Sequence, residues 1–190
     1  YEIGMSNVGM RILYGVMNQM EGVWCQRVFA PWGDMEEKMR AQNLPLWALE
    51  SQEPVKDFDM IAFTIGYEMS YSNILNMLDL AGVPLHCKDR KGLRNIVFAG
   101  GVCAYNPEPL ADFIDFFSLG EGEEITPEIL ECYRKARRED WDKDRFLLEV
   151  AKIPGVYVPS LYEHEYGKDG RLTTIRALPG APERVEKRII

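Results

Sequence analysis

The chain has 190 residues and a formal net charge of −8, from 22 Lys and Arg against 30 Asp and Glu. An acidic surface argues against a main role in binding a phosphate backbone, so we do not expect nucleic acid as a partner. A hydrophobic content of 46% indicates a folded protein with one well-buried core. No apolar run approaches the roughly 18 residues of a membrane-spanning helix, and no signal peptide is visible, so we expect a cytoplasmic protein without membrane contact.

The N-terminal part of the chain predicts alternating strand and helix. Residues 1–3 read as the end of a strand that is already under way, and because the chain does not begin with Met we expect a fragment of a longer protein. A helix is expected over 8–20, with Ser6 or Asn7 as its cap. Residues 23–29 predict a second strand.

The middle of the chain continues the same alternation. A polar helix is expected over 34–42 and a short strand over 46–49. Residues 60–64 form a continuous apolar run, which is typical of a strand buried on both faces. A helix follows over 71–81, and Gly82 marks its C-terminal end.

Two further apolar runs, 96–99 and 116–119, predict buried strands. A helix is expected from Thr126 to about 138, because Pro127 suits the first position of a helix. Residues 144–152 predict another short helix.

Strands separated by helices indicate a parallel sheet with helices on both faces. We therefore expect an α/β fold over 1–160, a doubly wound parallel sheet of the Rossmann-like or flavodoxin-like type with about five strands. Five residues are expected to mark the core of this sheet: Ile3, Val28, Ile61, Val97 and Phe117.

The tail, residues 161–190, has a different pattern. Two runs of alternating character flank Asp169 and Gly170, and an Asp-Gly pair between such runs predicts a β-hairpin. The residues after the hairpin read as a linker.

Four predicted strand ends carry glycine, and in an open parallel sheet ligands bind beyond the carboxyl ends of the strands. We therefore expect these strand ends, with Gly66, Gly100 and Gly120 among them, to share one rim. The alternative is that the glycines only end strands in tight turns. The candidate cofactor-binding residues are Gly4, Met5, Ser6, Thr64, Gly66, Tyr67, Gly100, Gly101, Cys103, Gly120, Glu121 and Gly122.

Two segments carry a resemblance to a known family. Residues 98–110 read Phe-Ala-Gly-Gly-Val-Cys-Ala-Tyr-Asn-Pro-Glu-Pro-Leu, and residues 115–124 read Asp-Phe-Phe-Ser-Leu-Gly-Glu-Gly-Glu-Glu. This pattern closely resembles the cobalamin-binding-type domain that precedes the catalytic barrel in many radical SAM proteins of the Fe–S oxidoreductase-like kind. Similarity in 1–18, 28–36 and 76–85 extends the resemblance over most of the chain.

The resemblance implies a division of labour. This domain would present cobalamin over the opening of a radical SAM barrel, and the hairpin and linker of 161–190 would lead towards that barrel in the same full-length chain. The barrel, which lies outside these residues, would hold a [4Fe–4S] cluster and S-adenosylmethionine. The barrel is therefore the expected partner.

One departure from the family bears on the cofactor. Methyltransferase-type cobalamin domains place an axial histidine after the first strand, in Asp-x-His-x-x-Gly, and residues 4–9 here contain none. Cobalamin would then bind without a protein histidine on cobalt. We expect His86 to be exposed in a loop and His164 to resemble that motif by coincidence. Two alternatives stay open, a docking or capping module that has lost cobalamin and a flavodoxin-like nucleotide-binding domain, although no phosphate loop follows the first predicted strand.

The cysteines and carboxylates do not indicate a catalytic site in this chain. Cys25, Cys87, Cys103 and Cys132 lack the spacing of metal or cluster ligands, and the Cys-x-x-x-Cys-x-x-Cys loop is absent. We expect no metal or iron–sulfur cluster here. The glutamates after Gly120 precede a predicted helix, where the helix dipole favours them.

Overall fold

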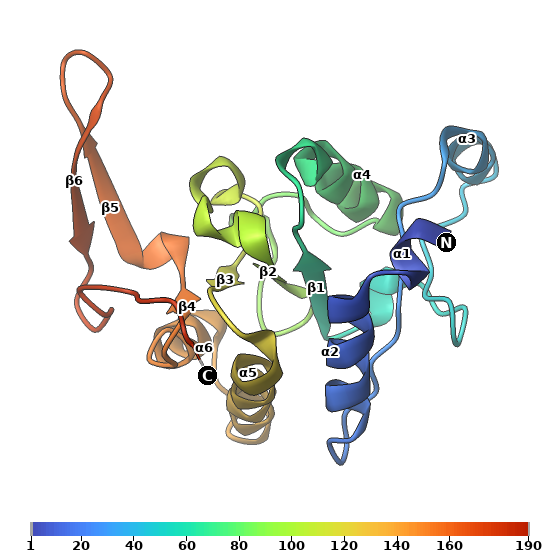
Figure 1. Cartoon of the computed structure of the whole chain (residues 1–190), viewed down its shortest axis with the longest axis horizontal. Helices are drawn as coiled ribbons and strands as arrows, with labels where there is room; N and C mark the ends of the chain where they lie inside the picture. Colours follow the sequence, from blue (N-terminus) through green and yellow to red (C-terminus); the bar gives the residue numbers. More distant parts are fainter. Residues whose placement is uncertain (1, 190) are drawn as a thin grey trace.

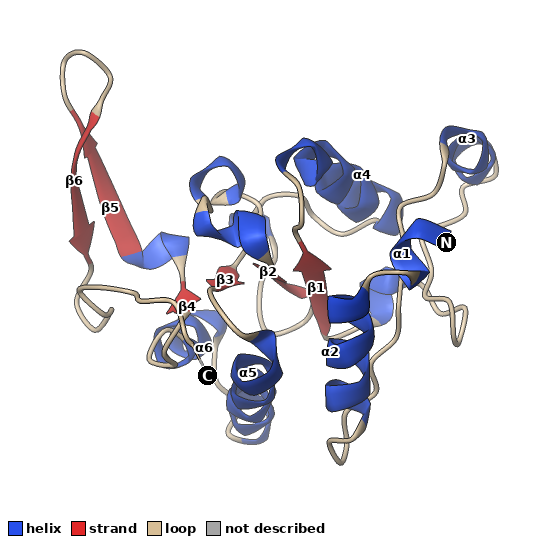
Figure 2. Cartoon of the chain, in the orientation of Figure 1, coloured by secondary structure: helices blue, strands red, loops and turns tan. Residues whose placement is uncertain are grey.

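The computed structural model describes residues 2–189 and shows a mixed α/β fold (Figures 1 and 2). Its main sheet has the order β1-β2-β3-β4, in which β1, β2 and β3 are parallel and β4 is antiparallel to β3. A two-stranded hairpin, β5 and β6, projects away from this sheet (Figure 1). The strands are β1 (Met60–Thr64), β2 (Ile96–Gly100), β3 (Phe116–Ser118), β4 (Val156–Tyr157), β5 (Tyr162–Tyr166) and β6 (Leu172–Ala177).

Helices cover both faces of the main sheet, with α4 on one side and α5 and α6 on the other (Figure 1). The α-helices are α1 (Glu2–Met5), α2 (Val8–Asn18), α3 (Gly33–Ala41), α4 (Tyr71–Ala81), α5 (Gly122–Arg138) and α6 (Lys143–Val150). Short 3₁₀ helices lie between them: η1 (Val55–Asp57), η2 (Glu68–Ser70), η3 (Cys87–Asp89), η4 (Val102–Tyr105), η5 (Glu108–Leu110) and η6 (Pro159–Leu161).

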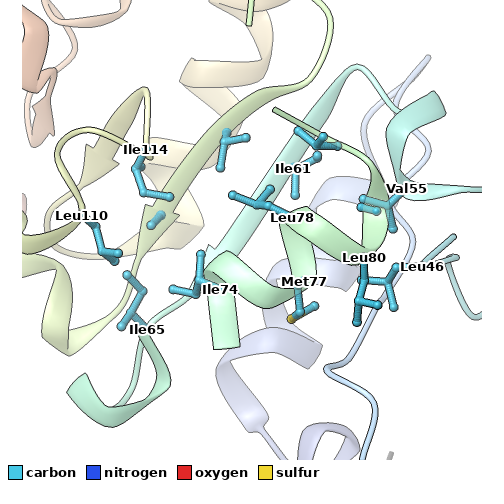
Figure 3. Packing of buried hydrophobic residues seen from close by; sticks show 14 of the residues in the cluster. Leu46, Val55, Ile61, Ile65, Ile74, Met77, Leu78, Leu80, Leu110 and Ile114 are labelled. Carbon is cyan, nitrogen blue, oxygen red and sulfur yellow. The ribbon is translucent and has the colours of Figure 1, made fainter. Parts of the chain in front are cut away.

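The strand β2 is buried on both faces and divides the core in two. Successive side chains of a strand point to opposite faces. Val97 and Ala99 therefore pack into the cluster under α4, together with Ile61 of β1 and Leu78 of α4 (Figure 3). Ile96 and Phe98 belong to the second cluster, under α5 and α6. This arrangement explains why β2 reads as a continuous apolar run.

A buried carboxylate joins the two halves of the core. The Asp115 side chain is fully buried and accepts a hydrogen bond from the Val97 amide at 2.8 Å. It also forms ion pairs with Arg90 at 3.0 Å and with Lys143 of α6 at 2.6 Å. Arg90 in turn donates to the carbonyl oxygens of Pro84, Leu85 and Phe113. We call these three charged residues the Asp115 cluster.

Several local predictions are confirmed. The Asn7 side chain caps α2 by accepting a hydrogen bond from the Met10 amide, and α4 ends at Gly82, which has a φ of 68°. The strands β1 and β2 and the hairpin around Gly170 also form where the sequence predicts them.

The prediction of five parallel strands is wrong. Tyr1 lies outside the described residues, and Ile3 lies in α1, a short helix. Residues 23–29, with Val28, form no strand, because their backbone groups bond to Asn18, Glu50 and Leu49 and not to a neighbouring strand. Residues 46–49 make only an isolated bridge, between Trp47 and Pro54. Apolar runs supply strand propensity, but a strand also needs a partner in space.

The boundaries near the C-terminus also differ from the prediction. The helix α5 begins at Gly122, four residues before Thr126, and contains Pro127 within it. The residues after the hairpin return to the sheet, because Arg188 forms a parallel bridge with Gly120 and its side chain pairs with Glu124 and Glu128 of α5. This part of the tail is therefore anchored to the first domain and is not a free linker.

Replacing Asp115 with Asn should destabilise the protein by about 3–5 kcal/mol, because Arg90 and Lys143 would remain buried without their counter-charge. Equilibrium unfolding in urea measures this loss. The matched control is Asp112→Asn, three residues away at an exposed position, which should stay within about 0.5 kcal/mol of the wild type. Equal stability of the two variants would contradict the structural role of the Asp115 cluster.

Candidate functional site

The carboxyl ends of the three parallel strands lie at one edge of the sheet. Gly100 ends β2 beside Thr64 of β1, and its carbonyl accepts a hydrogen bond from the Ile65 amide at 2.7 Å. A Cβ atom built on Gly100 would lie 3.5 Å from the carbonyl oxygen of Ser118, at the end of β3. Gly66 and Gly120 follow β1 and β3 by two residues. The shared rim that the sequence predicts is therefore present, while ligand binding there stays a prediction.

Large apolar side chains are exposed on the loops of this rim. Tyr67 and Met69 follow β1 and are 61% and 74% exposed, and Val102 and Tyr105 follow β2 and are 68% and 52% exposed. We call these four residues the apolar rim. Isolated exposed apolar residues are common, but a group of them at a sheet edge marks a surface that another molecule covers. The sequence interpretation missed Met69 and Val102, although an apolar residue in a glycine-rich loop is the signal that could have identified them.

Two of the predicted glycines accommodate the protein's own backbone. Gly101 has a φ of 100°, and a Cβ atom there would lie 2.7 Å from the carbonyl oxygen of Ile65. Gly120 has a φ of 118°, and a Cβ atom there would collide with the backbone of Arg188. Both positions require glycine for folding. A Cβ atom on Gly66, in contrast, would have no neighbour within 4 Å, so Gly66 is open to an approaching ligand.

The Cys103 side chain is buried, and the Glu68 side chain of the loop after β1 lies beside it. Cys103 belongs to the core cluster under α4, and its backbone amide donates to the Ile65 carbonyl at 3.0 Å. Burial raises the pKa of the Cys103 thiol, and the Glu68 carboxylate raises it further. A neutral, buried thiol is a packing group and not a nucleophile.

The predicted turn at Gly4, Met5 and Ser6 has a different structure. Gly4 and Met5 lie in α1, and a Cβ atom on Gly4 would collide with the ring of Phe29. Met5 is half-buried and Ser6 is exposed. This segment therefore packs against the end of residues 23–29, and the close approach at Gly4 is to an aromatic ring of the protein itself.

The residues after Gly120 have structural roles. Glu121 is the N-cap residue of α5, and a Cβ atom on Gly122 would lie 3.1 Å from the Leu13 side chain of α2. Glu124 pairs with Arg188 at 2.9 Å. Glutamates in the first turn of a helix also interact favourably with its dipole. These contacts agree with the structural interpretation of the carboxylates.

Both histidines contact protein groups. His86 is half-buried and packs against Phe113 with the rings tilted and their centroids 5.0 Å apart, so the expectation that it is exposed is wrong. His164 of β5 lies 3.3 Å from one carboxylate oxygen of Glu108, and Tyr157 donates to the other at 2.6 Å. Burial raises the pKa of Tyr157, and so does this hydrogen bond. The Glu108 carboxylate thus joins the Asn-Pro-Glu-Pro segment to β4 and to the hairpin.

A second candidate site is a cavity of about 760 Å³ beside β1. One wall is the outer edge of β1, and the other is the segment from Gly22 to Val28. Side chains of α2 and α5 form the rest, among them Leu13, Met17 and Tyr133. We call this cavity the β1 groove. Cys25 lies in its wall, where burial raises the pKa of the thiol to about 11, with Glu50 raising it and Arg27 lowering it by smaller amounts.

Within residues 2–189, no three His, Cys, Asp or Glu side chains converge as ligands of a metal ion would. No helix in the same range is long and apolar enough to cross a bilayer.

Cys25 should react slowly with iodoacetamide near neutral pH. A thiol with a pKa near 11 is only about one part in a thousand thiolate at pH 8, whereas an ordinary cysteine is about one quarter thiolate. Peptide-resolved mass spectrometry should show a rate that rises about tenfold per pH unit to near pH 11 while circular dichroism reports a folded chain. A short peptide containing cysteine is the control, and a plateau for Cys25 below pH 9.5 would disprove the shift.

Glycine substitutions should separate structural from open positions. Gly101→Ala should lower the free energy of unfolding by about 1–3 kcal/mol, because alanine is strained at this φ and its Cβ meets Ile65. Gly66→Ala should change it by less than about 0.5 kcal/mol, because the space around it is empty. Urea unfolding of both variants measures the difference, and a stable Gly101→Ala protein would count against the described turn.

The chain is similar to known proteins over most of its length. The family model for the N-terminal region of radical SAM proteins matches residues 9–159. A protein of Methanocaldococcus jannaschii, described as uncharacterized, is 31% identical over 156 residues, covering 75% of this chain and 33% of the relative. The chain thus spans about one third of that relative's length. No solved structure matches the chain significantly. From the family match over most of its length, we conclude that the chain belongs to the radical SAM proteins and carries their N-terminal domain.

Proposed function

We propose that this N-terminal domain is a Rossmann-like, cobalamin-binding-type domain, and that it presents cobalamin at the apolar rim to the radical SAM barrel of its full-length protein. The observation that carries the proposal is the group of exposed side chains at the carboxyl edge of the parallel strands, Tyr67, Met69, Val102 and Tyr105. Ligands of open α/β sheets bind at this edge. Large apolar side chains there suit a broad, flat ring system.

The residues of the rim fit a cofactor held by stacking and by backbone contacts. Gly66 leaves room for a ring to approach the backbone, and Tyr67 beside it can stack on that ring. His86 packs against Phe113 and His164 lies against Glu108, so neither is placed as a ligand of the rim. Cobalamin would therefore bind without a protein histidine on cobalt. When bound, the cofactor would supply alkyl-transfer or redox chemistry, and this domain would orient it and shield it from water.

The proposal also assigns the iron–sulfur chemistry to the barrel of the full-length protein. The four cysteines of this chain are free thiols in scattered positions, so the [4Fe–4S] cluster and S-adenosylmethionine are assigned to the barrel of the full-length protein. Free thiols are also typical of a reducing compartment, which supports a cytoplasmic location. The activity of the whole protein would then depend on the barrel together with the cobalamin that this domain presents to it.

A second candidate is a docking or capping module without cobalamin. The observation that favours it is the close packing at Gly101 and Gly120, where the missing side chains make room for Ile65 and Arg188 and not for a ligand. In that case the apolar rim would rest directly on the barrel. Both candidates bury the same surface, and they differ in whether a cofactor lies between the two domains.

Cobalamin titration of the full-length protein distinguishes the two. With hydroxocobalamin followed by absorbance, the wild type should bind in a 1:1 ratio, and Gly66→Trp should weaken binding at least tenfold because the indole would occupy the approach to the rim. Gly33→Trp is the matched control, since Gly33 in α3 also has no neighbour within 4 Å of an added Cβ atom. His164→Ala should leave the cobalt spectrum unchanged. Substitution of Gly101 is unsuitable here, because it would disturb folding.

Failure of the wild type to bind hydroxocobalamin would overturn the cobalamin proposal. The docking candidate would then predict that Tyr67→Ser with Val102→Ser makes the junction between the domains more sensitive to limited proteolysis. Unchanged proteolysis together with no cobalamin binding would exclude both candidates.

A further inference from the structure

The outer edge of β1 is unpaired within residues 2–189. The Asp59 carbonyl accepts from the Ile96 amide at 3.0 Å, and the Ile65 amide donates to Gly100 at 2.7 Å. In a strand, residues of one parity direct their backbone groups to one neighbour. The odd-numbered residues of β1 therefore bond to β2, and the amides of Met60, Ala62 and Thr64 point into the β1 groove.

This edge is unusual for a parallel sheet. Parallel strands are normally covered, and exposed edges are usually protected by charge, proline or a bulge. The sequence of β1 is Met-Ile-Ala-Phe-Thr, with none of these features, and Ala62 and Thr64 are exposed. The helix α2, which also lines the groove, has no fully buried residue, although Leu13 and Met17 face the groove. A surface that combines these apolar side chains with Arg134 and Arg137 of α5 is therefore left open on one side of the domain.

The opposite wall also has hydrogen-bonding capacity directed at the groove. Cys25 and Arg27 use their backbone groups towards Asn18, Leu49 and Glu50. Successive residues of an extended backbone direct their amides to opposite sides. The amides of Gln26 and Val28 therefore point away from Asn18 and Glu50, towards the groove that both residues line.

The two walls run in the same direction. Gly22, at the start of its segment, lies near Arg134 of α5, and Asp59, just before β1, pairs with Arg137 of the same helix. From there the 22–28 segment runs antiparallel to α2, since Cys25 bonds to Asn18 and Arg27 lies over the Tyr14 ring. A chain between the walls, parallel to both, would be paired on either side.

We propose that the β1 groove receives one further β-strand of about five apolar residues, parallel to β1, supplied by polypeptide joined ahead of α1 in the full-length protein. Two observations bear on this source. The strand would end where α1 lies, because Gly4 of α1 packs against Phe29 at the carboxyl end of the groove wall. A strand joined to α1 would then run parallel to β1 without a long connection. The relative is about three times the length matched here, so its chain extends well beyond the part that corresponds to this domain.

The added strand would complete the sheet. Its backbone would pair with Met60, Ala62 and Thr64 on one side and with Gln26 and Val28 on the other. Its side chains would pack on α2 and α5. Strand addition of this kind derives its affinity from main-chain hydrogen bonds and its specificity from alternate side chains.

Hydrogen exchange of the full-length protein tests the pairing. The amides of Met60, Ala62 and Thr64 should exchange about as slowly as those of Ile61 and Phe63, which bond to β2 and serve as internal controls. In an open groove the even-numbered amides would exchange about 100-fold faster or more. Such fast exchange in the full-length protein would overturn the proposal.

Photo-cross-linking tests the source of the strand. Trp24 lines the groove and is exposed, so p-azidophenylalanine at this position keeps an aromatic side chain and leaves the walls intact. On a monomer, the cross-linked peptide should be the one directly ahead of α1. A cross-link at Trp32, which is exposed outside the groove, is the control and should not capture that peptide. Capture of the barrel or of a second copy from position 24 would contradict the assignment.

Discussion

The buried Asp115 carboxylate is the constraint on which the rest of the sheet depends. Its burial requires full compensation of its charge, which Arg90, Lys143 and the Val97 amide supply. The Asp115 amide also donates to the Val97 carbonyl at 2.8 Å, so one residue binds both backbone groups of Val97. This fixes where β3 starts along β2. Lys143 holds the first turn of α6 beside Asp115. Arg90 donates hydrogen bonds to the carbonyl groups of Pro84 and Leu85 in the loop after α4.

The position of the rim follows from this alignment of β3 with β2. Because β1, β2 and β3 are aligned in parallel, the loops after Thr64, Gly100 and Ser118 open at one edge. Two surfaces of the domain are apolar and uncovered, the rim at the end of the strands and the β1 groove along their side. Both belong to the same sheet. A partner that covers each surface would bury apolar side chains that the core of this domain leaves exposed. The rim faces the barrel in our proposal, and the groove takes a strand.

Local signals predicted many elements correctly. Asn7 caps α2, Gly82 stops α4 and the Asp-Gly pair turns the hairpin, because each depends on the conformation of a few neighbouring residues. The apolar runs of β1 and β2 were also sufficient. Residues 23–29 resemble those runs and yet form no strand. Their strand propensity is real, but pairing depends on which backbone lies beside them, and that is decided far away in the sequence.

For the site, the sequence alone determined that glycine-ended strands would meet at one rim, since parallel strands must end together. It did not reveal which glycines serve the fold. Gly101 and Gly120 are needed because Ile65 and Arg188 approach them, and Arg188 comes from the tail, 68 residues beyond Gly120. It also did not show that Cys103 turns inward or that Met69 and Val102 turn outward. Close approach and exposure are properties of the packed chain, so only the tertiary structure decided them.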